Sequence, residues 1–533
     1  MNEESKLARG ALALSVAGIL SKVISIAYSP LLQKILGYDG MGVYGRVLDV
    51  FLFIYALTSV GAQPAVAKVV SELTALGNNK GAIRALKISR KFYFWTGTVA
   101  GLVMIGLAYP ISKMMNSSDV VYGIMALAPC IVITCLLSVY RGYLQGKGNM
   151  TPIAVSQILE QFLNVAISLL CAYILMNFSL ELGVAGAQIG TSIGALFALF
   201  YCIYGYYKRK YAEEALADTH HPSDKKIYRK MMMYSIPIIL SSGLQNFGGL
   251  VDSANVSTIL QSIGFAKKEA DSLYGIYTIY KTIIGVPLVL ITAIATTVLP
   301  LISKARALKD NKAVRSGIRN AFKLALSVAI PSAFGLSVLS EPIYRAIYDN
   351  DYGSFMMKVG SFIIIIMTIT QIQSVILQSI NKFYYVLLTF AIGIICKIAL
   401  NYFMVGIYEL NIYGVLIGNT VWHLIPAIMN HKKICKTMRM KMPVIRLVFK
   451  PLLSSIIMVA AIMIAKMPFN FMYRFINPTR LNSIPVVIVL VLVGAIVYLY
   501  IMILIGGIKK SDIELVSPRI IAIMPKFMRK KLK

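Results

Sequence analysis

Long apolar segments alternate with short polar ones along the whole 533-residue chain. The apolar segments are centred near residues 23, 55, 103, 130, 165, 195, 245, 288, 332, 367, 395, 422, 458 and 495. A helix needs roughly 20 apolar residues to cross the ~30 Å hydrocarbon core of a bilayer, and each segment reaches that length. The pattern therefore predicts an all-α polytopic membrane protein with about 14 transmembrane helices.

Composition excludes a soluble domain of this length. Apolar residues make up 58% of the chain and charged residues 14%, and the mean hydropathy is +0.72. A soluble protein could not bury that much apolar surface. The six Cys residues include no CxxC pair and fall mainly inside apolar segments, so neither a disulfide framework nor a zinc site is expected.

The net charge of +31 is spread over short connections, and no basic-aromatic nucleic-acid module is present. If the N-terminus lies inside, the inner segments hold 40 of the 53 Lys and Arg residues, and the outer connections hold ten. This bias predicts that both termini are cytoplasmic.

One motif occurs twice. Glu-Leu-x3-Gly-x2-Ile-Gly spans residues 181–190 and again 409–418. Weaker echoes in the same order favour a duplicated unit over chance similarity among Gly- and Leu-rich helices, and six spans per copy predict parallel repeats. The predicted parts are an N-terminal lobe (1–207), a cytoplasmic linker (208–230), a C-terminal lobe (231–436), two further helices (437–507) and a basic cytoplasmic tail (508–533).

Charged residues within predicted spans are candidates for function, because charge is costly in hydrocarbon. Lys22, Arg46 and Lys281 lie in equivalent helices of the two predicted lobes. Facing a shared cleft, they would suit a substrate that carries phosphate, particularly a pyrophosphate. Snorkelling of these side chains to nearby headgroups is the alternative.

A second group of polar residues predicts either an ion-coupling site or a structural ion pair. Asp252 is the one carboxylate of its span, and a salt bridge from Asp252 to Lys397 would neutralise both charges. Asn401 follows Lys397 by four residues, and Glu160 is the counterpart of Lys397 in the other copy of the repeat. No P-loop is present, so a membrane potential or an ion gradient is the expected energy source. No cofactor, metal or enzymatic site is expected.

Residues 141–161, with the sequence RGYLQGKGNMTPIAVSQILEQ, carry a family resemblance, supported by residues 40–44 and 61–68. The chain resembles the lipid II flippase and stage V sporulation protein B group of the multidrug/oligosaccharidyl-lipid/polysaccharide exporter superfamily. The resemblance implies a two-lobed, fourteen-helix carrier in a bacterial plasma membrane, serving peptidoglycan biosynthesis, cell shape or sporulation. Its expected substrate is an undecaprenyl-pyrophosphate-linked precursor, flipped from the inner to the outer leaflet by alternating access, with cell-wall synthases as possible partners.

The resemblance also bears on single residues. Ser21-Lys22 is similar to a Ser-Arg pair of the family, which implies a substrate role for Lys22, and Lys281 lies near a family arginine. Lys397 stands where some relatives hold sodium, so an ammonium in place of the ion is expected. Another lipid-linked polysaccharide unit, a multidrug antiporter and a non-transporting scaffold for cell-wall synthesis remain alternatives; drug cations favour acidic cavities and this one is expected to be basic.

Overall fold

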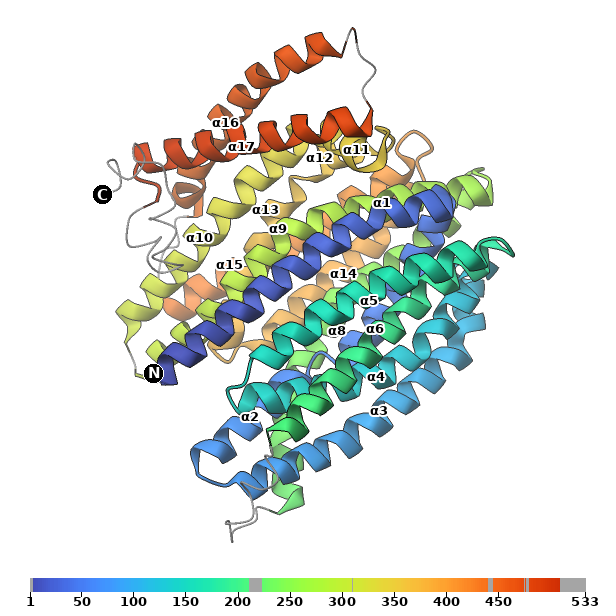
Figure 1. Cartoon of the computed structure of the whole chain (residues 1–533). Helices are drawn as coiled ribbons and strands as arrows, with labels where there is room; N and C mark the ends of the chain where they lie inside the picture. Colours follow the sequence, from blue (N-terminus) through green and yellow to red (C-terminus); the bar gives the residue numbers. More distant parts are fainter. Residues whose placement is uncertain are drawn as a thin grey trace. The chain divides into compact units, whose positions relative to one another are not determined.

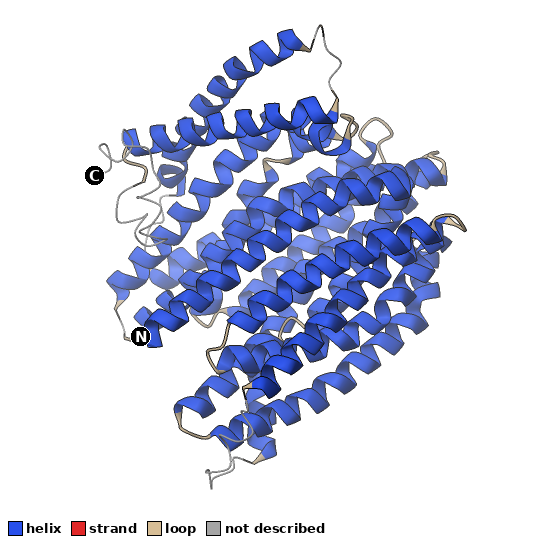
Figure 2. Cartoon of the chain, in the orientation of Figure 1, coloured by secondary structure: helices blue, strands red, loops and turns tan. Residues whose placement is uncertain are grey.

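The computed structural model describes residues 3–209, 223–308, 310–439, 444–473, 475 and 479–508. These residues form helices joined by short loops and contain no strand (Figure 2). The predicted all-α membrane class is confirmed. The predicted basic tail and most of the predicted linker, with His220 and His221, lie outside the described residues.

The helices follow one another with few residues between them (Figure 1). In chain order they are α1 Glu3–Thr58, α2 Ala62–Ala75, α3 Asn79–Met114, η1 Ser118–Val120, α4 Val121–Gly146, α5 Thr151–Leu175, α6 Leu180–Lys208, α8 Asp224–Ser262, α9 Lys267–Ala307, α10 Asn311–Val338, α11 Ser340–Tyr348, α12 Ser354–Gly360, α13 Ile363–Ser379, α14 Phe383–Val405, η2 Asn411–Tyr413, α15 Gly414–Met438, α16 Val444–Met472 and α17 Arg480–Leu504.

Every predicted apolar segment is centred inside one of these helices. Within the described residues, 11 helices are long and apolar enough to cross a membrane, or up to 12 if α12 and α13, bent by 49°, form one span. The count is lower than predicted partly because α1 contains two predicted segments. Its backbone breaks at Gly37, where φ is +72°, a conformation that favours glycine. The exact number of spans stays a prediction.

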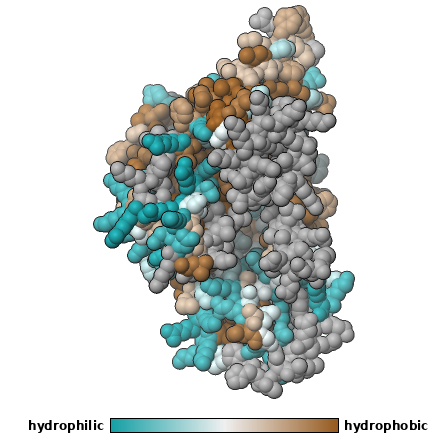
Figure 3. All heavy atoms as spheres, turned by 90° about the vertical axis from the view of Figure 1, so that its left-hand side faces the viewer, coloured by the Kyte–Doolittle hydropathy of each residue, from teal (hydrophilic) through white to brown (hydrophobic). Residues whose placement is uncertain are grey.

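Local sequence signals set several helix starts. The side chains of Asn78, Ser179 and Ser223 each accept a hydrogen bond from a backbone N–H of the first turn of α3, α6 and α8. Asp310 caps α10 in the same way. Such caps satisfy donors that have no partner within the helix. On the face shown in Figure 3, hydrophilic and hydrophobic side chains of the described residues gather in separate patches.

The chain divides into two compact units. Unit 1 comprises residues 1–279 and 394–418, and unit 2 comprises residues 280–393 and those from 419 onward. In unit 1, α3, α4, α5 and α6 pack side by side (Figure 1), and α8 packs on α1, α2 and α3. The boundaries differ from those of the predicted lobes because α8 and the first turns of α9 pack closely on helices of the first repeat. The division into repeats stays a prediction.

Unit 2 is built around α10. This helix packs on α13 and α16, while α17 packs on α16 and α11. The Tyr498 hydroxyl of α17 donates a 2.8 Å hydrogen bond to the Ser327 carbonyl of α10. The two helices outside the predicted repeats are therefore tied to α10 within this unit.

Candidate functional site

Unit 1 contains a group of buried polar side chains contributed by α1, α8, α9 and α14. This buried polar cluster consists of Arg46, Asp49, Asp252, Asp271, Tyr274, Tyr277, Lys397 and Asn401. The most exposed of them, Asp49, is 8% exposed, and Arg46, Asp252 and Lys397 are fully buried. Two cations and three carboxylates thus lie inside a part of the protein that is otherwise apolar.

Helical spacing brings these residues together. Residues three or four positions apart share one face of a helix. The cluster contains four such pairs: Arg46 and Asp49 on α1, Asp271 and Tyr274 and then Tyr274 and Tyr277 on α9, and Lys397 and Asn401 on α14.

Arg46 and Asp271 form an ion pair between α1 and α9. Arg46 Nη2 donates to Asp271 Oδ1, and the two side chains are 0% and 3% exposed. The Ser257 hydroxyl donates to the same carboxylate oxygen at 3.3 Å. Arg46 Nε and Nη1 are buried with no hydrogen-bond partner among the described residues. An unmet buried donor is unfavourable, so this guanidinium has unused capacity to bind an anion.

Asp49 extends the cluster along the same two helices. The Tyr274 hydroxyl donates a 2.8 Å hydrogen bond to Asp49 Oδ2. The Tyr274 ring also lies beneath the guanidinium, with Arg46 Cζ 5.9 Å from the ring centroid, within the range of a cation–π interaction. Tyr274 therefore connects the arginine to the second carboxylate of α1.

Asp252 is the centre of the other half of the cluster. Its Oδ2 accepts from Lys397 Nζ at 2.9 Å and from the Tyr277 hydroxyl at 2.7 Å, and its Oδ1 accepts from Asn401 Nδ2 at 2.8 Å. Lys397 also donates to the Gly248 carbonyl at 2.8 Å. The two predicted partners are thus in contact, and the ammonium occupies the place beside the carboxylate that a bound cation would take. A role in ion coupling stays a prediction.

The backbones of α1 and α9 touch at three glycines. A Cβ atom on Gly42 would lie 1.9 Å from the Asp271 carbonyl oxygen, and one on Gly275 would lie 1.9 Å from the Tyr38 carbonyl oxygen. A Cβ atom on Gly45 would meet the Thr278 hydroxyl at the same distance. Only glycine allows so close a crossing. Below, this contact is called the glycine crossing.

The other two predicted substrate-binding cations are not part of this cluster. Lys22 is partly exposed on α1, and the 24 residues that separate it from Arg46 correspond to roughly 36 Å of helix. Lys281 is partly exposed on α9 and belongs to unit 2. Arg46 itself forms a buried ion pair and does not face an open cleft. The substrate roles of the three residues stay predictions.

Glu160, which the sequence grouped with Asp252 and Lys397, has its partner on α4. Its Oε2 accepts from Arg141 Nη2 at 2.7 Å, and Arg141 Nε donates to Ser156 Oγ at 3.0 Å. These residues join α4 to α5. Glu160 therefore belongs to a separate ion pair in unit 1 and is not hydrogen-bonded to Asp252.

Sequence reasoning did not identify Asp271, Tyr277 or Arg141 as site residues. The predicted span was centred near residue 288, which left Asp271 in a connection, whereas α9 begins at Lys267. A usable signal was present, because Asp271, Tyr274 and Thr278 follow the spacing of one helix face.

Comparison with known proteins agrees with this fold. The family model described as polysaccharide biosynthesis protein matches residues 7–306. Lipid II flippase MurJ of Bacillus subtilis (strain 168) is 24% identical over 527 residues, which cover 93% of this chain and 95% of that protein. Stage V sporulation protein B of the same organism is 24% identical over 415 residues, which cover 76% and 79%.

Among solved structures, lipid II flippase MurJ in an inward closed conformation matches with a TM-score of 0.64. The match has 15% sequence identity and covers 92% of this chain and 98% of that one, which establishes a shared fold. The resemblance noted in the sequence is confirmed by these matches. Because the family model spans more than half of its length, this chain belongs to the polysaccharide biosynthesis protein family.

Proposed function

We propose that this protein is a flippase that moves an undecaprenyl-pyrophosphate-linked cell-wall precursor, lipid II, from the inner to the outer leaflet by alternating access. A sugar pyrophosphate cannot cross ~30 Å of hydrocarbon unaided, because transferring charged and hydroxyl groups out of water is costly. A carrier must shield the headgroup and offer it cations. The two relatives described above, lipid II flippase MurJ and stage V sporulation protein B, support this class of substrate.

The observation that carries the proposal is the ion pair of Arg46 and Asp271 at the glycine crossing. Buried charge in a membrane protein marks functional pathways more often than it adds stability. We propose that this crossing is the gate on the extracytoplasmic side, closed in the structure. When it opens, Arg46 exchanges Asp271 for a pyrophosphate, which satisfies the guanidinium donors that are unpaired in the closed state.

We place energy coupling at the pair of Asp252 and Lys397. A buried carboxylate joined to an ammonium responds to protons or to the membrane potential when its surroundings change. Sodium is disfavoured because Lys397 already supplies the positive charge beside Asp252. The protein would act in a bacterial plasma membrane, with both termini cytoplasmic and cell-wall synthases as partners.

Depletion of the protein in its bacterial host, followed by measurement of lipid-linked precursors in the inner leaflet, tests the substrate. Accumulation of lipid II supports the proposal. Accumulation of a different lipid-linked sugar identifies the exporter of another polysaccharide unit. Unchanged precursor levels with increased sensitivity to cationic drugs would indicate a multidrug antiporter.

Complementation of the depleted cells separates a carrier from a scaffold. Lys22→Ala should abolish complementation while the protein remains in the membrane, because a carrier needs this cation for the pyrophosphate. Arg46→Gln combined with Asp271→Asn, which leaves no buried charge unpaired, should do the same. Lys432→Ala, which changes an exposed cation of α15, is the control and should complement fully. A scaffold would tolerate all three variants.

A further inference from the structure

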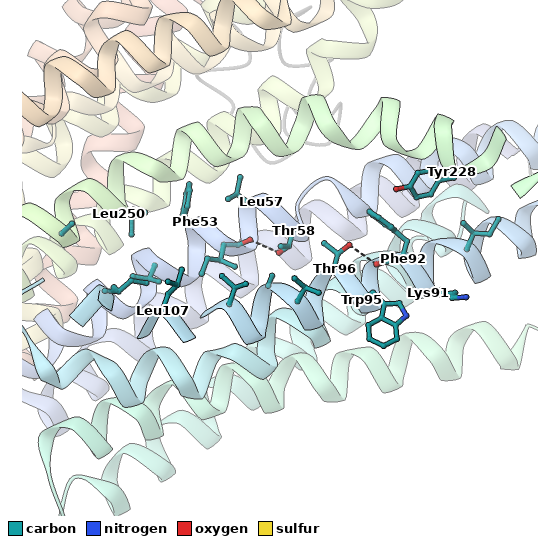
Figure 4. A pocket seen from close by; sticks show the side chains of 18 of the residues that line it. Phe53, Leu57, Thr58, Lys91, Phe92, Trp95, Thr96, Leu107, Tyr228 and Leu250 are labelled. Carbon is teal, nitrogen blue, oxygen red and sulfur yellow. Dashed lines mark hydrogen bonds between the residues drawn. The ribbon is translucent and has the colours of Figure 1, made fainter. Parts of the chain in front are cut away.

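Unit 1 has a groove of about 1190 Å³ between α1, α3 and α8, and no residue of the buried polar cluster lines it (Figure 4). Apolar side chains line most of its length, among them Phe53, Leu57, Val103, Leu107 and Leu250. The volume exceeds that of ordinary small-molecule pockets, which run from about 300 to 1,000 Å³.

The two threonine hydroxyl groups in the groove are already used. Thr58 Oγ1 donates to the Ile54 carbonyl at 2.8 Å, and Thr96 Oγ1 donates to the Phe92 carbonyl at 3.0 Å (Figure 4). Both threonines therefore satisfy their hydroxyls on their own helices. The middle of the groove is suited to hydrocarbon.

The groove is long. Lining residues recur at every third or fourth position of α3 from Ile88 to Met115, which is about 40 Å of helix at 1.5 Å per residue. The hydrocarbon core of a bilayer is ~30 Å thick, and each leaflet makes up about half of that thickness. The groove is therefore much longer than one leaflet is deep. The acyl chains of one phospholipid would fill only part of such a groove.

Cations lie at one end of the groove only. Lys91 and Lys225 line that end, and within the described part of the chain neither pairs with a carboxylate. Asp224 also lines it but accepts from Arg84 Nε, and this hydrogen bond lowers the pKa of the Asp224 carboxyl. The opposite end is lined by uncharged residues such as Ile111 and Met115.

Aromatic residues at the basic end of the groove indicate that this end lies at the membrane–water interface. The rings of Phe92 and Tyr228 pack edge to face at 5.4 Å, and Trp95 lies beside them on α3 (Figure 4). Trp and Tyr are enriched at the level of lipid headgroups. On the orientation predicted from the basic connections, this is the cytoplasmic interface.

We infer that the groove binds a polyprenyl phosphate lipid, with its phosphate group at Lys91 and Lys225 and its single long chain along α3. A chain of this kind is long enough to pass from one leaflet into the other, and it has one charged end, like the groove. The choice of a polyprenyl chain rests on the proposed function. The length of the groove and its single cationic end are observations that are independent of that proposal. The site is a second contact with the carrier lipid, apart from the cations proposed to hold the headgroup.

The chain contains only two Trp residues, Trp95 and Trp422, which allows a direct test. The Trp422→Phe protein, placed in vesicles of brominated phosphatidylcholine, reports bromine quenching at the groove through Trp95. Undecaprenyl phosphate at a low mole fraction should protect Trp95 from quenching, whereas dioleoyl phosphatidylglycerol at the same fraction should not. The Trp95→Phe protein, whose buried Trp422 lies outside the groove, should show no protection.

Variants distinguish binding of the lipid in the groove from a general attraction of anionic lipids to the protein. Lys91→Gln with Lys225→Gln should raise the concentration needed for protection by roughly 10- to 30-fold, at about 1 kcal/mol for each cation. Ala100→Phe, which fills the groove, should remove protection altogether. Lys432→Gln with Lys436→Gln, two exposed cations of α15, should leave it unchanged.

Two results would overturn the inference. Equal protection by phosphatidylglycerol would show a site for any anionic lipid, and no protection by either lipid would show only boundary lipid at Trp95. Because the assay measures binding without transport, its failure leaves the depletion experiment unaffected. A substrate other than lipid II in that experiment would likewise leave the binding result standing.

Discussion

The buried polar cluster and the groove are built on two shared helices, α1 and α8. On α1, Arg46 and Asp49 belong to the cluster, whereas Phe53 and Leu57 line the groove. On α8, Asp252 belongs to the cluster and Leu250 to the groove. On α1 the two sets follow one another along one face at successive turns, whereas on α8 the two positions point in different directions, so one helix can carry both chemistries.

The two regions differ in how far the stabilising contribution of each side chain depends on its neighbours. In the cluster each charge is favourable only while its counter-charge is in place, so single changes are costly. In the groove each apolar group contributes in rough proportion to its area, and similar shapes can replace one another. The cluster is therefore expected to be sensitive to single substitutions, and the groove to be tolerant of them.

The largest expected effect concerns which side of the membrane holds the basic end of the groove. In a cysteine-free background, Leu76→Cys and Asn311→Cys should be protected from an impermeant thiol reagent in intact cells, because the basic connections predict a cytoplasmic location. Ser118→Cys should label. Ser118 is chosen because it is exposed, whereas the neighbouring Ser117 is buried. The reverse labelling pattern would place the cations of the groove at the outer leaflet.

The next largest effect tests the dependence on partners inside the cluster. Asp252→Asn and Lys397→Met should each cost about 3–5 kcal/mol, because each leaves a buried charge without its partner, while the double variant should be close to neutral. Thermal unfolding in detergent and protein level in the membrane measure this. Glu341→Gln, which breaks exposed ion pairs of α11, is the control and should cost less than ~1 kcal/mol. Additive losses in the double variant would show that the two residues do not act as a pair.

A smaller effect is expected at the glycine crossing. Gly275→Ala places a methyl group against the Tyr38 carbonyl and should destabilise the protein by roughly 1–3 kcal/mol, as overpacking does. Transport should fall, while protection of Trp95 by undecaprenyl phosphate should persist, since no residue of the crossing lines the groove. Gly106→Ala on α3, where a Cβ atom meets nothing within 4 Å, is the matched control. If both substitutions act alike, the crossing is not a constrained contact.

The smallest effect compares the loss of a hydroxyl in each region. Ser257→Ala removes a donor to the buried Asp271 carboxylate and should cost about 1 kcal/mol or somewhat more. Thr96→Val removes a hydroxyl bonded only to its own helix and should change the unfolding free energy by less than ~0.5 kcal/mol. Denaturation midpoints of the two variants, measured side by side, check the difference. Equal costs would contradict the distinction between the two regions.

The sequence was sufficient for features that depend on local pattern. Hydropathy located every membrane-length segment, because the need for about 20 apolar residues is met within each helix separately. The pairing of Asp252 with Lys397 could also be predicted, since isolated charges in hydrocarbon require partners.

Two other features that depend on tertiary contact were missed. Arg46 was identified, but its partner Asp271 lies 225 residues away and reaches it only because glycines let α1 and α9 approach. The groove could not be predicted from the sequence either, because a lipid-facing surface and the lining of a groove have the same apolar composition. Only the packing of α3 against α1 and α8 makes that surface concave.

The ion pair at the glycine crossing has a kinetic consequence. Separating Arg46 from Asp271 without replacing either partner costs about 3–5 kcal/mol, and each ~1.4 kcal/mol slows a step tenfold. An empty protein would then open this crossing roughly 10² to 10⁴ times more slowly than one whose cargo supplies an anion to Arg46. On the proposed function, the pair would act as a check against idle cycling, so that a gradient driving the carrier would not be dissipated when no cargo is loaded.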